Sequence, residues 1–290
     1  IRGEITAGAM IVGSLLMTRA LQPIDMLLNS WKAFGQALVS FRRVSEVMGT
    51  GESSDVSLEV PSPRDGSVDV NRLVVCLAGR RVIDGVSFRV ASGSVSLISG
   101  PSGSGKSTLI KTMLFPRDVE SGSITLGGVP AQRMDSAGRA ASFGYLPQEV
   151  RLLSGSVADN IAGFTEVDSQ AIVEATKLAG VHELILRLPQ GYETPVGVAG
   201  QLLSSGQRQR IALARAIYKW PKFVFLDEPD ANLDDIGSAA LAACLDSLKT
   251  RGVTTFIVSH RFKDFDKIDH HFELSEGAVR ETLPIKSTTI

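Results

Sequence analysis

The stretch Gly100-Pro101-Ser102-Gly103-Ser104-Gly105-Lys106-Ser107-Thr108 decides the fold of this chain. It follows the apolar run 95–98 and opens into residues 109–114, which have the composition of a helix. In such a strand–loop–helix context, glycines let backbone N–H groups converge on phosphate oxygens without steric clashes. The N-terminus of the helix adds the positive end of its dipole. The sequence therefore predicts a site for a nucleoside triphosphate such as ATP.

A second polar group follows another apolar run. Residues 223–226 are all apolar, and Asp227 and Glu228 come directly after them. A buried parallel strand that ends in two acids places both at the sheet edge where the phosphate loop lies. We expect Lys106 to reach the β- and γ-phosphates, and Ser107 and Asp227 to hold Mg²⁺. Glu228 is then the predicted general base that polarises the attacking water.

Bulk composition excludes some classes of protein. The chain has 290 residues, a formal net charge of −1 and a pI near 6.5, so no basic field dominates. This balance argues against a general nucleic-acid binder. Cys76 and Cys244 lie in apolar contexts without the spacing of metal ligands, and we interpret them as reduced thiols in a cytosolic domain.

Two apolar stretches, 5–17 and 20–28, stand near the start of the chain. Neither reaches the length of about 20 residues that a membrane span needs, but together they are long enough. We therefore predict that residues 1–48 are the C-terminal end of a transmembrane domain, with basic residues such as Lys32 on the cytoplasmic side. The first residue, Ile1, further suggests a longer native chain. A signal peptide and an amphipathic helix packed on a soluble domain are the alternatives.

The remaining composition suggests the domain plan. Residues 49–66 are rich in Gly, Ser, Pro and Asp and are typical of a linker. Alternating apolar residues before the phosphate loop predict antiparallel strands, and strands alternate with helices from residue 223 onward. We expect an α/β domain over 67–285, with a helical subdomain at about 154–204 and a tail at 286–290.

The segment 203–210 reads LSSGQRQR and precedes a helix predicted over 211–218. It resembles the signature motif of ATP-binding-cassette (ABC) ATPases, in which it completes the nucleotide site of a facing subunit. The resemblance implies a homodimer that encloses two ATP molecules between its nucleotide-binding domains. The hydroxyl and backbone groups at this helix start offer a second anion-binding surface. The residues concerned are Ser204, Ser205, Gly206 and Gln207, and Ser205 stands where the family usually has glycine.

Three further positions match ABC motifs. By resemblance, Gln148 belongs to the glutamine loop that senses Mg²⁺ and touches the membrane domain, Asp234 belongs to the loop that links the two sites, and His260 is the switch histidine at the γ-phosphate. The family commonly stacks adenine on an aromatic side chain, but residues 74–79 contain none. Leu77 offers an apolar face there instead, and stacking by the guanidinium of Arg80 or Arg81 is the alternative. The implied fold is a P-loop ABC nucleotide-binding domain with a mixed sheet core, an antiparallel β subdomain and a helical subdomain, preceded by a long membrane-to-cytoplasm helix.

The resemblance covers nearly the whole chain. Segments outside the ATPase motifs resemble type I secretion permease/ATPases of the protease- and lipase-type branch; they include 144–148 (GYLPQ), 159–162 (DNIA) and 188–194 (LPQGYET). This implies the ATP-hydrolysing motor of a protein exporter in the bacterial inner membrane, with a periplasmic adaptor and an outer-membrane channel as partners. The alternatives are an exporter of lipids, peptides or small molecules, and a fragment that hydrolyses ATP without transporting. A soluble ABC ATPase that acts on DNA or ribosomes is disfavoured by the apolar N-terminal segment.

Overall fold

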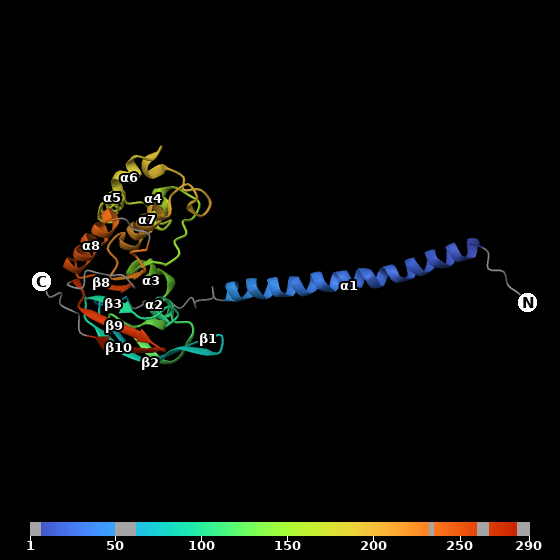
Figure 1. Ribbon diagram of the computed structural model, residues 1–290, viewed down its shortest axis with the longest axis horizontal. Coiled ribbons are helices and arrows are strands. Elements are labelled where there is room, and N and C mark those ends of the chain that lie inside the picture. Colours follow the sequence, from blue (N-terminus) through green and yellow to red (C-terminus); the bar gives the residue numbers. More distant parts are fainter. Residues whose placement is uncertain (1–6, 50–61, 232–234, 260–266, 283–290) are drawn as a thin grey trace, which may run out of the picture. The chain divides into compact units, whose positions relative to one another are not determined.

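A computed structural model describes residues 7–49, 62–231, 235–259 and 267–282 (Figure 1). The chain divides into two compact units, residues 1–58 and 59–290. The first contains helix α1, Ala7–Gly49, which includes Pro23 and carries many exposed apolar side chains, among them Leu16 and Trp31. No helix in the described ranges combines the length and the apolarity that a membrane crossing requires.

The second unit is built on a six-stranded sheet with the order β10-β9-β3-β8-β7-β6. Five of its strands run parallel, and β10 pairs with β9 in the antiparallel direction. Nearly every residue of its central strands β3, β7 and β8 is buried, as is typical of parallel strands that are covered on both faces. The bounds are β3 Val95–Ser99, β6 Phe143–Leu146, β7 Phe223–Asp227, β8 Thr254–Val258, β9 His270–Ser275 and β10 Ala278–Thr282.

A second sheet has four antiparallel strands in the order β2-β1-β4-β5. The antiparallel strands predicted before the phosphate loop are therefore present, and β4, which follows the loop, ends in a turn at Gly127. Their bounds are β1 Val68–Leu77, β2 Arg80–Val90, β4 Val119–Leu126 and β5 Val129–Pro130.

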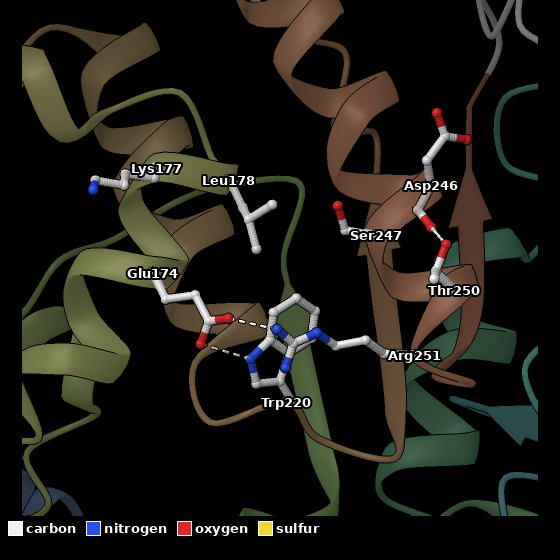
Figure 2. A pocket seen from close by; sticks show the side chains of 8 residues that line it. All are labelled: Glu174, Lys177, Leu178, Trp220, Asp246, Ser247, Thr250 and Arg251. Atoms are coloured by element: carbon white, nitrogen blue, oxygen red, sulfur yellow. Dashed lines mark hydrogen bonds and ion pairs between the residues drawn. The ribbon is translucent and has the colours of Figure 1, made fainter.

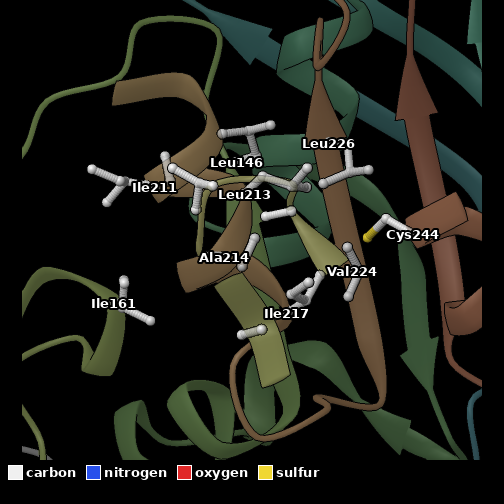
Figure 3. Packing of buried hydrophobic residues seen from close by; sticks show 14 of the residues in the cluster. Leu146, Ile161, Ile211, Leu213, Ala214, Ile217, Val224, Leu226 and Cys244 are labelled. Atoms are coloured by element: carbon white, nitrogen blue, oxygen red, sulfur yellow. The ribbon is translucent and has the colours of Figure 1, made fainter. Parts of the chain in front are cut away.

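Side chains alternate between two cores along the central strands. In β7, Phe223 and Phe225 join the core that contains the antiparallel sheet and helix α2 (Lys106–Leu114). Val224 and Leu226 join the other core, which includes helical residues of the segments 157–217 and 241–248 and is shown in Figure 3. The six-stranded sheet is thus covered on both faces, as a mostly parallel sheet requires. The mixed α/β architecture predicted from the sequence is confirmed.

Helices occupy most of the region between β6 and β7. Ser156 begins α4 with a capping box to Asp159, and Asp168 accepts hydrogen bonds from the first turn of α5. The bounds are α3 Ser136–Ser142, α4 Val157–Ala162, α5 Ser169–Leu178, α6 His182–Leu186 and α7 Ser205–Ile217, with α8 Asp235–Thr250 after β7; short 3₁₀ turns η1, η2 and η3 lie at Ala131–Arg133, Gly191–Glu193 and Val198–Gly200.

Helix α7 begins six residues earlier than the sequence analysis predicted. Ser204 is its N-cap, and a capping box joins Ser204 to Gln207. The buried apolar residues on which the prediction was based begin only at Ile211. The capping box at Ser204 and Gln207 instead determines where the helix begins. The predicted helix over 211–218 is therefore wrong at its start.

A surface cavity lies between α5 and α8 (Figure 2). The Glu174 carboxylate accepts hydrogen bonds from Trp220 Nε1 at 3.0 Å and from Arg251 Nη2 at 2.6 Å. The Arg251 guanidinium lies 3.7 Å from the centre of the Trp220 ring, a cation–π arrangement. This three-residue cluster joins α5 to the segments that flank β7 and β8.

Candidate nucleotide-binding site

The loop between β3 and α2 has the conformation that phosphate binding needs. Gly100, Gly103 and Gly105 have φ values of +141°, +78° and +103°. A Cβ atom on Gly100 would lie 2.0 Å from the carbonyl oxygen of Leu274, so that glycine is required by close packing against β9. Leu109 N–H bonds to Gly105 O at 2.8 Å, so the helical hydrogen bonds begin directly at the loop. Free N–H groups of the first turn can therefore receive an anion.

The same loop leaves room for a ligand. A Cβ on Gly103 would meet no atom within 4 Å, in contrast to Gly100. The Ser104 hydroxyl is buried and has no hydrogen-bond partner among the described residues. An open glycine and a buried unsatisfied hydroxyl in one phosphate loop fit the β- and γ-phosphates of ATP.

Lys106 crosses back over the loop. Its ammonium group donates to Gly100 O at 2.9 Å and to Pro101 O at 2.8 Å. Burial lowers the pKa of Lys106, and the charges of Glu228 and Asp227 oppose that shift. A lysine held inside its own loop is a ready counter-charge for the terminal phosphates.

Ser107 and Asp227 come together as predicted. The Ser107 hydroxyl donates to Asp227 Oδ1 at 3.1 Å, and Asp227 is only 1% exposed. Burial raises the pKa of Asp227, while the Ser107 hydrogen bond opposes the rise. A hydroxyl and a carboxylate are hard oxygen donors that Mg²⁺ accepts beside phosphate oxygens and water, so these two residues fit that ion.

Glu228 sits in a strained backbone conformation at the end of β7. Its φ is +52°, which is unusual for a residue with a side chain and is typical of functional sites. Its N–H donates to Val258 O at 2.8 Å. The Gln209 amide donates to Glu228 O at 3.2 Å and to Pro229 O at 3.3 Å. Sequence reasoning missed Gln209, although its spacing from the buried residues Ala212 and Leu213 placed it on the inner face of α7.

Gln148 lies just beyond β6, next to the two carboxylates along the sheet edge. Leu146 pairs with Leu226, so Gln148 and Glu228 each follow a paired residue by two positions on neighbouring parallel strands. Gln148 is exposed.

Within β6, burial and the charge of Asp227 raise the pKa of Tyr145 to about 12, and its buried hydroxyl has no partner among the described residues.

The signature segment forms the exposed start of α7. Gln207 N–H donates to Ser204 Oγ at 3.2 Å, and Ser204 N–H donates to Gln207 Oε1 at 2.8 Å. Ser204 and Ser205 are exposed, and Gly206 is half-buried. A hydroxyl that accepts one hydrogen bond can still donate its own proton. The segment thus presents hydroxyl and N–H groups outward at a helix N-terminus.

Two predicted site residues, Asp234 and His260, lie outside the described residues. The flanking chain leads toward the carboxylates, because Val258 pairs with Asp227 and the Ser259 hydroxyl donates to Asp230 Oδ2 at 2.7 Å. Another histidine, His271, forms a hydrogen bond with Ser99, the residue that directly precedes the phosphate loop. His271 Nε2 lies 2.7 Å from Ser99 Oγ.

Leu77, expected near adenine, is 38% exposed at the end of β1. It pairs with Arg80 across the hairpin, and a Cβ on Gly105 would lie 3.1 Å from Val82 of the same β2 strand. The hairpin end is therefore beside the phosphate loop. The neighbouring Arg81 is engaged by Glu120 at 3.1 Å.

Comparison with known proteins identifies the family. Residues 83–231 match the family model described as "ABC transporter", and these residues make up half of the chain. The chain belongs to the ABC transporter family. The ABC segment includes the phosphate loop, the signature motif and both carboxylates.

The chain is 39% identical over 282 residues to the type I secretion system ATP-binding protein PrsD of Rhizobium meliloti, covering 97% of this chain and 48% of that protein. It is 37% identical over 200 residues to an ATP-dependent lipid A-core flippase of Saccharophagus degradans, covering 69% and 34%. The human mitochondrial iron–sulfur clusters transporter ABCB7 is 31% identical over 289 residues, covering 96% and 38%. The chain therefore spans about half or less of the length of these relatives.

A solved bacterial Atm1-family ABC exporter with ATP bound is also similar, with a TM-score of 0.73 and 27% identity over 98% of this chain and 51% of that one. The predicted ABC fold and the resemblance to type I secretion ATPases are confirmed. The predicted domain boundaries and the roles of individual site residues remain predictions.

Proposed function

We propose that this ABC domain hydrolyses ATP at a composite site in a homodimer. The observation that carries the proposal is the meeting of Ser107 and Asp227 at 3.1 Å beside an open phosphate loop. The loop N–H groups and Lys106 bind and orient the phosphates, which places the γ-phosphate at the sheet edge that carries Glu228. Ser107, Asp227 and Gln148 would hold Mg²⁺, which would supply positive charge beside the phosphate oxygens.

The chemical step then depends on the residues around the attacking water. Glu228 accepts a proton from that water, and Gln148 and His260 orient the water and the γ-phosphate. Ser204, Ser205, Gly206 and Gln207 of one subunit cover the ATP held by the other, and Asp234 lies in the loop that links the two sites. The exposed start of α7 supports this assignment, because the exposed Ser204 and Ser205 are accessible to a second subunit.

Hydrolysis measured across protein concentrations tests the composite site. In the 290-residue chain we expect a rate that rises faster than linearly with protein concentration and that falls to a small residual rate in Glu228→Gln. A strictly linear rate from a chain that light scattering shows to be monomeric at those concentrations would contradict the dimeric site, and hydrolysis that persists undiminished in Glu228→Gln would remove Glu228 as the general base.

We further propose that the hydrolysis drives export, with protein as the substrate class. PrsD, named as a type I secretion ATP-binding protein, matches 97% of this chain, including α1. The exposed apolar side chains of α1 suit packing against other membrane helices, and this supports a bacterial inner-membrane location with the ABC domain in the cytoplasm. A periplasmic adaptor and an outer-membrane channel are the corresponding partners.

The similarity to a lipid A-core flippase keeps lipid export as the second candidate. Flotation with lipid vesicles tests the membrane proposal, and co-sedimentation with DNA or ribosomes tests the soluble alternative. Stimulation of hydrolysis by an unfolded polypeptide, but not by lipid A, supports protein export, and the reverse result supports the second candidate.

A further inference from the structure

Gln209 is a buried polar residue in the same helix as the signature segment. It is 4% exposed and lies two residues beyond Gln207 in α7. Its side-chain amide donates to two successive carbonyls, Glu228 O at 3.2 Å and Pro229 O at 3.3 Å. These carbonyls belong to the turn that leaves β7. One side chain therefore connects the signature helix directly to the backbone of the predicted general base.

That turn is anchored from two different directions. On the β8 side, Glu228 N–H donates to Val258 O at 2.8 Å, and Ser259 Oγ donates to Asp230 Oδ2 at 2.7 Å. On the α7 side, Gln209 supplies both hydrogen bonds. The φ of +52° at Glu228 is unfavourable by itself and persists only while surrounding contacts maintain it. A displacement of α7 relative to β8 therefore acts on the backbone that carries the Glu228 carboxylate.

We propose that Gln209 is a positioning residue that couples the signature segment to the general base of the same subunit. This inference rests on the proposed function. The signature segment at the start of α7 engages the ATP held by the facing subunit, whereas Glu228 serves the ATP held by its own subunit. Because α7 is one continuous helix from Ser205 to Ile217, its engagement moves Gln209, and Gln209 sets the orientation of Glu228. Occupancy of one site thereby controls hydrolysis at the other.

Two variants remove the donor while keeping the volume of the side chain. Gln209→Met replaces the amide with an apolar chain of similar length, and Gln209→Leu replaces it with a branched apolar chain. Gln170→Met, on an exposed position of α5, is the matched control. All variants are made in the 290-residue chain, and ATP affinity and melting temperature are measured beside kcat and KM.

We expect both Gln209 variants to lower kcat by about tenfold or more while KM and ATP affinity stay within about threefold, because binding and chemistry respond to different contacts. The Gln170→Met variant should match the unmodified chain. A merely structural role predicts a lower melting temperature with unchanged kcat, and that result would overturn the proposal. If Gln209→Met does not fold, Gln209→Leu carries the same comparison.

A double-mutant cycle with Glu228→Gln tests whether Gln209 acts through Glu228. We expect Gln209→Met to change the residual rate of Glu228→Gln by less than about twofold, since coupled residues are not additive. An equal fold-loss in both backgrounds would overturn the proposal. Persistent hydrolysis in Glu228→Gln alone would instead contradict the proposed function. Loss in Glu228→Gln with normal rates in both Gln209 variants would contradict only this inference.

Discussion

The Ser107 hydroxyl donates a hydrogen bond to Asp227 Oδ1 at 3.1 Å, although 120 positions separate the two residues in the chain. Ser107 is the second residue of α2, the helix after the phosphate loop, and Asp227 ends β7. Parallel strands bring their carboxyl ends to one edge, so the two oxygens meet where Mg²⁺ and the phosphates are expected.

Asp227→Asn should lower Mg²⁺-dependent hydrolysis at least about 100-fold, because charge neutralisation by the metal is worth several kcal/mol in the transition state. ATP affinity without Mg²⁺ should change little, since the loop N–H groups and Lys106 remain. Isothermal titration with and without Mg²⁺, beside a hydrolysis assay, measures both effects. Equal Mg²⁺ dependence in the variant and in the unmodified chain would contradict the assignment.

Asp227→Asn should also stabilise the nucleotide-free protein at pH 7. Burial raises the pKa of Asp227, so as pH rises the carboxyl ionises in the unfolded chain before it ionises in the folded protein. Stability therefore falls between the two pKa values and stays lower above them. Asparagine removes that loss, and we expect a melting temperature higher by roughly 1–3 °C at pH 7. The gain should shrink as pH falls below the folded pKa, and a lower melting temperature at pH 7 would contradict the argument.

Gly100→Ala and Gly103→Ala should separate folding from binding. A Cβ on Gly100 would lie 2.0 Å from Leu274 O, so we expect destabilisation by about 3 kcal/mol or more. Gly103 faces open space, and its φ of +78° makes alanine unfavourable by only about 1–2 kcal/mol. Gly103→Ala should nevertheless weaken ATP binding, because the methyl group enters the phosphate cradle. Urea unfolding and ATP titration measure the two quantities, and unchanged ATP affinity in Gly103→Ala would place the phosphates elsewhere.

The sequence predicted the parts of the site that depend on local pattern. The glycine loop has a fixed spacing, and the run 223–228 joins a buried strand to two acids, so both could be placed before any contact was known. The start of α7 was missed because the capping box at Ser204 lies outside the apolar stripe. The partners of Gln209 could not be predicted, since they follow from how α7 packs against the end of β7.

Leu77→Tyr should tighten ATP binding about 2–10-fold, because an aromatic ring stacked on adenine contributes about 0.5–1.5 kcal/mol. Leu77 is 38% exposed at the hairpin end that flanks Gly105 through Val82. Leu186→Tyr, on an exposed position at the end of α6, is the control. Fluorescence titration with ATP measures the affinity. No change in affinity for Leu77→Tyr would remove Leu77 from the adenine site.

The cluster of Glu174, Trp220 and Arg251 should stabilise the ABC domain by more than an ordinary surface ion pair. Arg251→Met removes both the 2.6 Å contact with Glu174 and the stacking over Trp220. We expect a loss of about 1–2 kcal/mol, since exposed ion pairs are worth at most about 1 kcal/mol and cation–π contacts add about 0.5–1 kcal/mol. Arg251→Lys should recover less than half of the loss, because lysine lacks the flat guanidinium that stacks on the ring.

The control for this cluster is Arg89→Met, which breaks the 2.5 Å pair with Asp69 on the antiparallel sheet. That pair is also exposed, and Arg89 stacks on no aromatic ring among the described residues. Arg89→Met should therefore lower the free energy of unfolding by less than about 1 kcal/mol. Urea unfolding of the three variants measures the difference. Equal losses for Arg251→Met and Arg89→Met would show that the Trp220 stacking contributes nothing, and the cluster would then be no stronger than its ion pair.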